Sequence, residues 1–495
     1  MECFILFLLV ELGGIFLDNQ QIMAEHPNIK KGAIMFALLM AGFIGLFSET
    51  ALNMAFTNIM TEYGIGAAEV QWLTTGYLLT LGIFLPVTAL LIQWFTTRQL
   101  FLGSVLLSLF GTLFGALAPS FAWLLVARVI QALGTGLLLP LMTNVILLII
   151  PIHKRGSAMG LVSLVILLAP AVGPTFSGFL IEAMHWKLIF WVCLILLLIP
   201  LLVGMKYVEN ISVITRPKID VLSIVLSTIG FGGLVFGFSS AEGGLESWAE
   251  PRVWLTLIIG FIGLALFIIR QLKLEKPVLN IRVLKHPMFV LGILLAFICM
   301  FVILGTAVLL PIYLKSALLL SALVAGLVLL PGGLINGLMS LVTGRLFDLF
   351  GPKWLVLFGT LGMSIVSFVF FFFIFTETPV WLIVILHICL LVCIALVIMP
   401  AQTNGLNQLP KQMYPDGTAI MNTLQQIAGA MGTALAISTM TAGQMKYMQT
   451  VENPDAPAVI MEALAAGVKS SFFFVFVFAV IAFIVSLFIK RVSIQ

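Results

Sequence analysis

Residues 33–56 read AIMFALLMAGFIGLFSETALNMAF, and Glu49 is the one charged side chain in this stretch. About 20 apolar residues are enough for a helix to cross the hydrocarbon core of a bilayer. The whole chain has the same character, with 61% hydrophobic and 9% charged residues, whereas soluble proteins carry about 25% charged residues. The composition therefore indicates a polytopic membrane protein, and the small net charge of +4 gives no reason to expect a nucleic-acid partner.

Fourteen stretches have the length and composition of membrane spans. They are 33–57, 69–92, 100–118, 122–147, 156–181, 188–207, 221–240, 253–270, 288–311, 319–343, 354–375, 380–402, 417–442 and 470–489. Lipid offers no partner to backbone N–H and C=O groups, so every span is expected to be helical. The predicted fold class is all-α.

The positions of lysine and arginine predict the orientation of these spans. If residue 31 is cytoplasmic and the sides alternate, 18 of the 24 basic residues lie on the inner side, five on the outer side, and Arg128 falls within a span. Cytoplasmic loops of membrane proteins carry such an excess. We therefore expect a multi-pass protein of the cytoplasmic membrane with both termini inside.

Two segments with linker composition, 208–220 and 271–287, bracket the seventh and eighth spans. The predicted domains are a cytoplasmic or interfacial segment (1–32), a six-helix bundle (33–207), linkers with two extra helices at 221–240 and 253–270 (208–287), and a second six-helix bundle (288–491). Residues 1–22 lack a basic start and contain Glu11 in an apolar run, while Met23 begins an ordinary cytoplasmic lead-in. We interpret 1–22 as a start-site artefact or a loose surface segment, with an interfacial helix as the alternative.

A faint internal repeat supports the two bundles. ALLIQWFTTR (89–98) follows the second span, GRLFDLFGPK (344–353) follows the tenth, and the two align without a gap, pairing Phe95 with Phe350 and Arg98 with Lys353. Repeated halves around a central site are typical of transporters.

Glu49 and Arg128 are the candidate proton-coupling pair. From its helix start Glu49 lies about 22 Å into a core about 30 Å thick, and Arg128 is predicted to share its layer, near the outer surface. An apolar surround favours the neutral acid and a guanidinium favours the carboxylate. The pair thus predicts either a proton site or a static ion pair that fixes helix packing.

Several further polar residues in the spans are candidates for a substrate path. They are Asn53, Gln71, Gln131, Asn422, Gln425 and Gln426. Amides at such depths either line a wet path or bond between helices.

The segment GRLFDLFGPK is expected to form a loop in which Gly344, Arg345, Asp348 and Gly351 act as a cytoplasmic latch or form a plain solvated turn. LLAPAVGPTFSGFL (167–180) places Pro170, Gly173, Pro174 and Gly178 in one span, which predicts a kinked and closely packed helix.

The cysteines and histidines predict no metal site, disulfide framework or cofactor. All five cysteines lie in apolar runs without a CxxC pair, which is typical of packing residues. His387 is the one histidine deep in an apolar run, where a hydrogen-bonded buried imidazole is the expectation and a proton carrier the alternative.

The order and spacing of several stretches resemble the major facilitator superfamily, in particular its fourteen-span drug:proton antiporters of the EmrB/QacA type and their lincomycin-resistance-like branch. The stretches are VQWLTTGYLL (70–79), RVIQALGTG (128–136), AVGPTFSG (171–178), HWKLIFWV (185–192), KIDVLS (218–223), GRLFDLFGPK (344–353) and TNGLNQLP (403–410). The resemblance implies the major facilitator fold, with two six-helix bundles and two extra central helices.

By this resemblance Arg128 matches the coupling arginine of the fourth span, Gly173 and Pro174 match the antiporter motif, and Asp348 matches the loop aspartate. The chain departs from the family where Ser48 stands for the first-span aspartate, so that Glu49 is one place along, or about 100° around the helix.

The implied function is proton-driven export of lipophilic or cationic drugs, without catalysis, by a monomer. The alternatives are an exporter of an endogenous lipid or metabolite, and a membrane scaffold or sensor that transports nothing.

Overall fold

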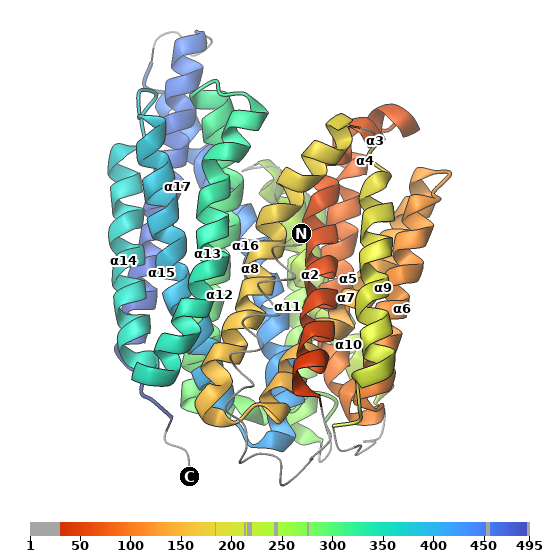
Figure 1. Cartoon of the computed structure of the whole chain (residues 1–495). Helices are drawn as coiled ribbons and strands as arrows, with labels where there is room; N and C mark the ends of the chain where they lie inside the picture. Colours follow the sequence, from red (N-terminus) through yellow and green to blue (C-terminus); the bar gives the residue numbers. More distant parts are fainter. Residues whose placement is uncertain are drawn as a thin grey trace. The chain divides into compact units, whose positions relative to one another are not determined.

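The computed structural model of the chain describes residues 30–183, 185–211, 214, 220–241, 246–274, 277–451 and 456–492. Its long elements are all helices, shown in chain order in Figure 1. They are α2 (Lys31–Ala51), α3 (Phe56–Tyr63), α4 (Ala67–Val70), α5 (Trp72–Trp94), α6 (Thr97–Ala116), α7 (Phe121–Ile149), α8 (Arg155–Ala183), α9 (Leu188–Tyr207), α10 (Val221–Ser240), α11 (Pro251–Lys273), α12 (Pro287–Ile312), α13 (Ala322–Phe350), α14 (Pro352–Phe373), α15 (Val380–Asn407), α16 (Tyr414–Met448) and α17 (Pro457–Ser486). The interpretation of residues 1–22 lies outside the described residues.

Thirteen helices of the described part are long and apolar enough to cross a membrane, and they coincide with thirteen of the predicted spans. The fourteenth, 417–442, lies inside α16, whose 35 residues include the amides and glycines that lower its hydropathy. The expectation that every span is helical is confirmed.

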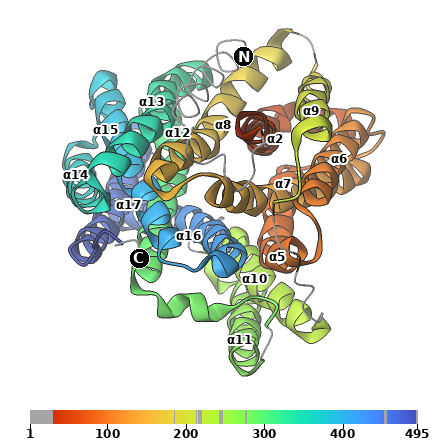
Figure 2. The same ribbon diagram turned by 60° about the horizontal axis from the view of Figure 1, so that its bottom comes forward.

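The first compact unit contains the chain up to Asp220 together with 274–280 and 410–422. Within it α2 packs against α7, α8 and α9, while α7 also packs against α5 and α6. Figure 2 shows α2 between α7, α8 and α9. This central place of α2 is why Leu38, Leu39 and Met35 are fully buried.

The second unit contains 221–273, 281–409 and 423–495. Here α15 packs against α12, α13 and α14, and α17 packs against α12 and α14. The extra helices α10 and α11 form a hairpin in which Gly233 and Gly260 let the two backbones touch. The loop of this hairpin contacts α16, because the Trp248 indole donates to the Ser438 hydroxyl at 2.6 Å.

The helix pairings of the two units repeat. In each unit the second helix of the bundle packs on the fourth, the third on the fourth and sixth, and the first on the fourth and sixth. The ungapped alignment of 89–98 with 344–353 also places the start of α6 at Thr97 opposite the start of α14 at Pro352. The contacts therefore support the internal repeat that the sequence indicates.

The segment GRLFDLFGPK differs from the predicted loop. Helix α13 continues to Phe350 and α14 begins at Pro352, so the connection is Gly351 alone. Gly351 has φ +76°, a conformation that a side chain disfavours. A proline at the first helical position needs no helical N–H partner, which lets the next helix start at once.

We predict that Gly351→Ala destabilises the protein by roughly 1–2 kcal/mol, because alanine disfavours a positive φ. Its Cβ would also lie 2.9 Å from Cδ of Arg491. Thermal unfolding of the purified protein in detergent measures the effect. Gly326→Ala, in the same helix α13, is the matched control. Apart from the helix's own nearby backbone, its added Cβ would have no described atom within 4 Å, so the substitution is expected to be neutral or slightly stabilising. Equal melting temperatures for the two variants would contradict the prediction.

Candidate functional site: a buried arginine against the turn of Glu49

The guanidinium of Arg128 is the centre of the first unit's polar network. The side chain is 1% exposed. Nε donates to the carbonyl of Leu73 at 3.2 Å, Nη1 to that of Ser48 at 3.0 Å, and Nη2 to that of Glu49 at 3.1 Å. One side chain of α7 thereby bonds the backbones of α5 and α2.

The backbone of α2 changes its pattern beside this arginine. The α-helix ends at Ala51, the N–H of Leu52 donates to the carbonyl of Thr50, and a 3-10 turn, η1, follows over Leu52–Ala55. In a continued α-helix the carbonyls of Ser48 and Glu49 would accept from the N–H groups four residues later. The change of pattern therefore lies next to the two carbonyls that Arg128 binds.

Neutral polar groups complete the surroundings of Arg128. Its Nη1 also donates to Gln131 Oε1 at 3.1 Å, and Gln131 Nε2 donates to Thr112 Oγ1 at 2.9 Å. The guanidinium carbon lies 4.3 Å from the ring centroid of Tyr77, whose hydroxyl lies 2.8 Å from Thr135 Oγ1. The structure thus places Gln131, a predicted substrate-path residue, within the arginine network.

The structure brings Glu49 to Arg128 through its backbone. The Glu49 side chain is half-buried, and among the described residues no ion pair within 4.0 Å joins its carboxylate to the guanidinium. The predicted ion pair is therefore absent from this state of the described chain. Tyr77 and the carbonyls of α2 are the partners that sequence reasoning missed; TGYLL, inside a stretch quoted for its resemblance, is the signal for Tyr77.

Gly173, which matches the antiporter motif by resemblance, lies against the same turn of α2. A Cβ on Gly173 would overlap the Thr50 hydroxyl and approach the Phe47 carbonyl oxygen to 3.2 Å. Pro174 has no N–H, so the carbonyl of Pro170 lacks its helical donor; the Thr50 hydroxyl lies 3.4 Å from that oxygen. Helix α8 therefore fits α2 where Glu49 stands.

The remaining candidates lie in several places. Asn53 is exposed in η1 and accepts from the Thr74 hydroxyl at 2.7 Å, and Gln71 is exposed at the start of α5. Asn422 is half-buried in the part of α16 that belongs to the first unit.

In the second unit, Gln425 is buried and Gln426 half-buried on α16. Gly344 is buried, Arg345 exposed and Asp348 half-buried near the end of α13.

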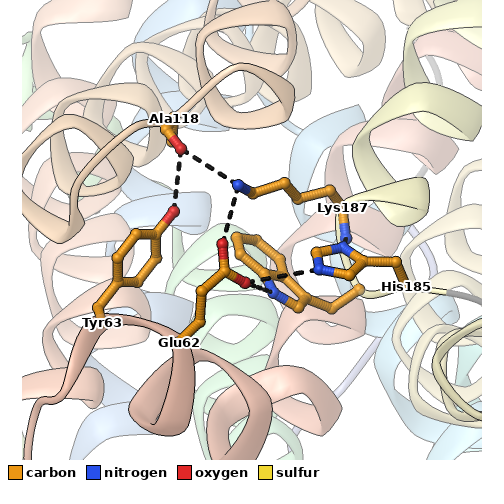
Figure 3. Close-up of polar contacts among 6 residues, drawn as sticks. Glu62, Tyr63, Ala118, His185 and Lys187 are labelled. Atoms are coloured by element: carbon orange, nitrogen blue, oxygen red, sulfur yellow. Dashed lines mark hydrogen bonds and ion pairs between the residues drawn. The ribbon is translucent and has the colours of Figure 1, made fainter.

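A second polar cluster, which sequence reasoning missed, ties α3 to the turn before α9 (Figure 3). Glu62 Oε1 lies 2.9 Å from Lys187 Nζ, and Glu62 Oε2 accepts from the Trp186 indole at 2.5 Å. Lys187 also donates to the carbonyl of Ala118 at 3.3 Å, and the Tyr63 hydroxyl donates to the same oxygen at 3.0 Å. Sequence reasoning had counted Lys187 only as an outer charge.

Charge pairing shifts the titration of this cluster. Burial raises the pKa of Glu62, but the hydrogen bonds from Lys187 and Trp186 outweigh it and leave the pKa below its ordinary value. Burial lowers the pKa of Lys187, and the bond to Glu62 outweighs it and raises that pKa. The pair is therefore ionised throughout the neutral range.

A third cluster joins the start of α16 to the start of α8. Arg155 is 2% exposed, and it donates to the Tyr414 hydroxyl at 2.8 Å and to the carbonyl of Leu147 at 2.6 Å. Nearby in sequence to Tyr414, the buried Asp416 accepts from the N–H of Asn280 at 2.9 Å. The start of α16 is thus bonded to α8 by Arg155 and to the backbone of Asn280 by Asp416, side chains of opposite sign.

Comparison with known proteins places these features in a family context. Residues 38–433 match the family model described as "Major Facilitator Superfamily". A "Lincomycin resistance protein LmrB" of Bacillus subtilis is 59% identical over 93% of this chain and 96% of that protein. A protein of the same name from Listeria monocytogenes is 54% identical over 95% and 99%, and a "Multidrug export protein EmrB" of Haemophilus influenzae is 28% identical over 83% and 81%.

Solved structures agree with the fold. The human organic anion transporter MFSD10 (TETRAN) superposes with a TM-score of 0.62 over 90% of this chain and 99% of that one, at 13% identity. The proton:xylose symporter XylE superposes with a TM-score of 0.57 over 89% and 94%, at 16% identity. Identities this low support the fold alone.

We predict that Gly173→Ala destabilises the protein by about 1–3 kcal/mol, the cost of overpacking a close helix contact. Thermal unfolding in detergent measures it. Thr50→Ala in the same chain removes the overlapping hydroxyl and is expected to recover part of the loss. Gly178→Ala is the control from the same helix, since its Cβ would meet only Met54 Cε at 3.8 Å. A Gly173→Ala protein as stable as Gly178→Ala would show that the contact is not tight.

We predict that Glu62→Gln lowers stability by less than about 1 kcal/mol at neutral pH, because the pair is partly exposed. A carboxylate with a lowered pKa stabilises the fold above its unfolded value, 4.5, and loses this contribution as the pH falls through the lower folded value. The melting-temperature difference from the unsubstituted protein is therefore constant near pH 7 and shrinks in acid.

Glu69→Gln is the control for this series, because the exposed Glu69 carboxylate accepts a hydrogen bond from the nearby Gly66 N–H at 2.9 Å and, among the described residues, does not pair with a lysine. A difference for Glu62→Gln that grows in acid would have the wrong sign for an ion pair.

Proposed function

Because the chain belongs to the major facilitator superfamily, we propose that it is a multi-pass exporter that expels small lipophilic or cationic drugs from the cell in exchange for protons. It is a transporter and not an enzyme. The printed names of its relatives, lincomycin resistance and multidrug export proteins, support drugs as the substrate class. Lincomycin is the first compound to test.

The observation that carries the proton-coupled mechanism is the bonding of the buried Arg128 to the turn that holds Glu49. Arg128 donates to the carbonyls of Ser48 and Glu49, so the guanidinium charge is fixed beside the lone carboxyl of α2. Glu49 takes up a proton from the outer side and releases it to the inner side. Each change of its charge alters the electrostatic attraction between α2 and α7.

The same geometry links the proton to a helix movement. When Glu49 is ionised, its carboxylate competes with the carbonyls of Ser48 and Glu49 for the N–H groups of Arg128. When Glu49 is neutral, the guanidinium of Arg128 stays hydrogen-bonded to the two carbonyls. The charge of one carboxyl therefore selects between two bonding patterns of α2, and Gly173 and Thr50 carry the difference to α8. Gly344, Arg345, Asp348 and Gly351 form the inner latch, and the chain acts as a monomer with both termini in the cytoplasm.

The energy available is sufficient for such an exchange. A membrane potential of 100 mV supplies about 2.3 kcal/mol per charge moved, and a pH gradient adds to it. The amides of α16, Gln425 and Gln426 in the second unit and Asn422 in the first, together with Asn53, Gln71 and Gln131 in the first, are the proposed polar contacts along the substrate path.

We predict that Glu49→Gln abolishes pH-gradient-driven export while leaving the protein folded, because glutamine keeps the shape and the backbone carbonyl but cannot change charge. In inside-out vesicles with an imposed pH gradient, ethidium fluorescence measures uptake of the dye. In cells, the lincomycin susceptibility of a pump-deficient host measures export. Glu62→Gln, outside the arginine network, is the control with the same chemical change and is expected to transport normally.

Full gradient-driven export by Glu49→Gln would remove Glu49 from the mechanism. A chain that moves no compound under any gradient would instead favour a scaffold or sensor. Export of an extracted cell lipid, with no protection against drugs, would favour an endogenous substrate.

A further inference from the structure

Helices α13 and α15 carry three buried polar atoms that have no hydrogen-bond partner in the described chain. They are Asn336 Oδ1, Thr343 Oγ1 and His387 Nδ1. Their side chains are 3%, 0% and 7% exposed. The expectation of a hydrogen-bonded imidazole at His387 finds no protein partner for Nδ1 among the described residues.

The polar residues of α13 lie on one face. Gly332, Asn336, Ser340 and Thr343 are spaced by four, four and three residues, the spacing of one side of a helix. The position of His387 shows that this face meets α15: a Cβ on Gly332 would overlap His387 Nδ1 and lie 2.7 Å from Cε1. Helices α13 and α15 pack on each other, as both views show (Figures 1 and 2).

His387 and Arg128 make comparable contacts in the two repeats, although the ungapped alignment pairs Arg128 with Ile383, one helical turn before His387. Arg128 and His387 are each seven residues after the first residue of the fourth helix of their bundle, Phe121 in α7 and Val380 in α15. The ungapped alignment that pairs Phe95 with Phe350 also pairs Tyr77 with Gly332. Arg128 lies over the Tyr77 ring and His387 lies against Gly332, so the same contact between second and fourth helices recurs.

The two comparable sites satisfy their polar atoms differently. In the first unit a long guanidinium reaches four oxygens itself. In the second unit the imidazole is shorter and a glycine replaces the tyrosine, and polar atoms remain without partners. A buried polar group left unpaired lowers stability, and native proteins commonly satisfy such groups with ordered water.

Charged side chains do not supply the missing partners. Of the charged residues in α12, α13 and α14, the helices that pack on α15, Arg345 and Asp348 lie near the end of α13 and Lys353 at the start of α14. Arg345 is thirteen residues from Gly332, about 20 Å along the helix. At the level of Gly332 and Asn336 the missing partner must therefore be small and neutral, and able both to donate and to accept; Thr343 lies two residues from Arg345, but its hydroxyl has no partner among the described residues.

We propose that the α13–α15 interface is a binding site for ordered water, with His387, Asn336 and Thr343 as its ligands. Gly332, against which the imidazole lies, is one turn from Asn336, about 6 Å along the axis. A single water bridges two polar atoms about 4.5 Å apart, since each hydrogen bond is about 2.8 Å and the two meet near the tetrahedral angle, so side chains one turn apart can share one water. Asn336 Oδ1 accepts a hydrogen bond from this water, and His387 Nδ1 forms a second hydrogen bond with the same water. Thr343, two turns further, binds a second water.

X-ray radiolytic labelling of the full chain in detergent tests the site, because radicals formed from a bound water oxidise the side chains beside it. Tandem mass spectrometry separates His387 from Cys389 and Cys393 of the same peptide. Met363 in α14, 0% exposed and intrinsically more reactive, is the internal control. We expect His387 to be oxidised several-fold faster than Met363. Labelling of His387 no faster than that of Met363 would show a dry interface and overturn the proposal.

Asn336→Leu provides the second measurement. If water bridges Asn336 and His387, the substitution reduces the labelling of His387 and does not raise the melting temperature. If Asn336 is dry, leucine removes an unpaired amide without loss, so the protein becomes more stable while the labelling of His387 is unchanged. The second result would overturn the proposal.

Discussion

A permanently charged side chain buried within a helical bundle sets the arrangement of the first unit. A guanidinium remains ionised at any physiological pH, and a buried charge without partners would cost several kcal/mol. Arg128 meets this requirement with backbone carbonyls of two neighbouring helices and one amide. The carbonyls must point at α7, so α2 leaves its α-helical pattern at Leu52, and α5 presents Leu73 and the face of Tyr77.

The close approach of α2 to its neighbours follows from the same requirement. Gly45 admits the Thr135 side chain of α7, Gly173 admits Thr50, and Gly111 admits the backbone of α7 at Gln131. Larger side chains at these positions would move the helices apart and pull the carbonyls away from the guanidinium. Small residues therefore let the helices of this unit approach closely, as they do in other membrane proteins, where van der Waals packing rather than a hydrophobic driving force holds helices together.

The sequence predicts the spans of this fold well and the partners within it poorly, for physical reasons. Span positions follow from the cost of exposing backbone to lipid, which depends on composition alone, and even α16 was found despite its polar residues. The pairing of Glu49 with Arg128 was predicted from their equal depth in the bilayer. Two residues at the same depth on neighbouring helices can still point their side chains in different directions. What could not be foreseen is that backbone carbonyls serve as the acceptors, because every residue has one and no residue type marks those that are used.

The same limit explains the misread segment around Asp348 and the missed cluster at Glu62. GRLFDLFGPK is expected to be a loop because it lies between the predicted spans 319–343 and 354–375, but α13 continues through it to Phe350 and the turn requires only the positive φ of Gly351. Glu62 and Lys187 are 125 residues apart. No local pattern in the sequence pairs residues so far apart, and their contact depends on the packing of α3 against the turn before α9.

The bonding of Arg128 to carbonyls has a consequence for exchange. Were its charge balanced only by Glu49, protonation of that carboxyl would leave a buried cation without a partner, at a cost large enough to prevent the step. Carbonyl dipoles of α2 and α5 keep the guanidinium bonded in either case. Under the proposed mechanism the carboxyl is thereby free to gain and lose its proton, and the free energy of each change goes into the choice between two bonding patterns. In the second unit the contact of the second and fourth helices is made by Gly332 and His387, and polar atoms beside it have no partner among the described residues. The two halves, alike in helix pairing, therefore differ in whether a permanently charged side chain stands at this contact.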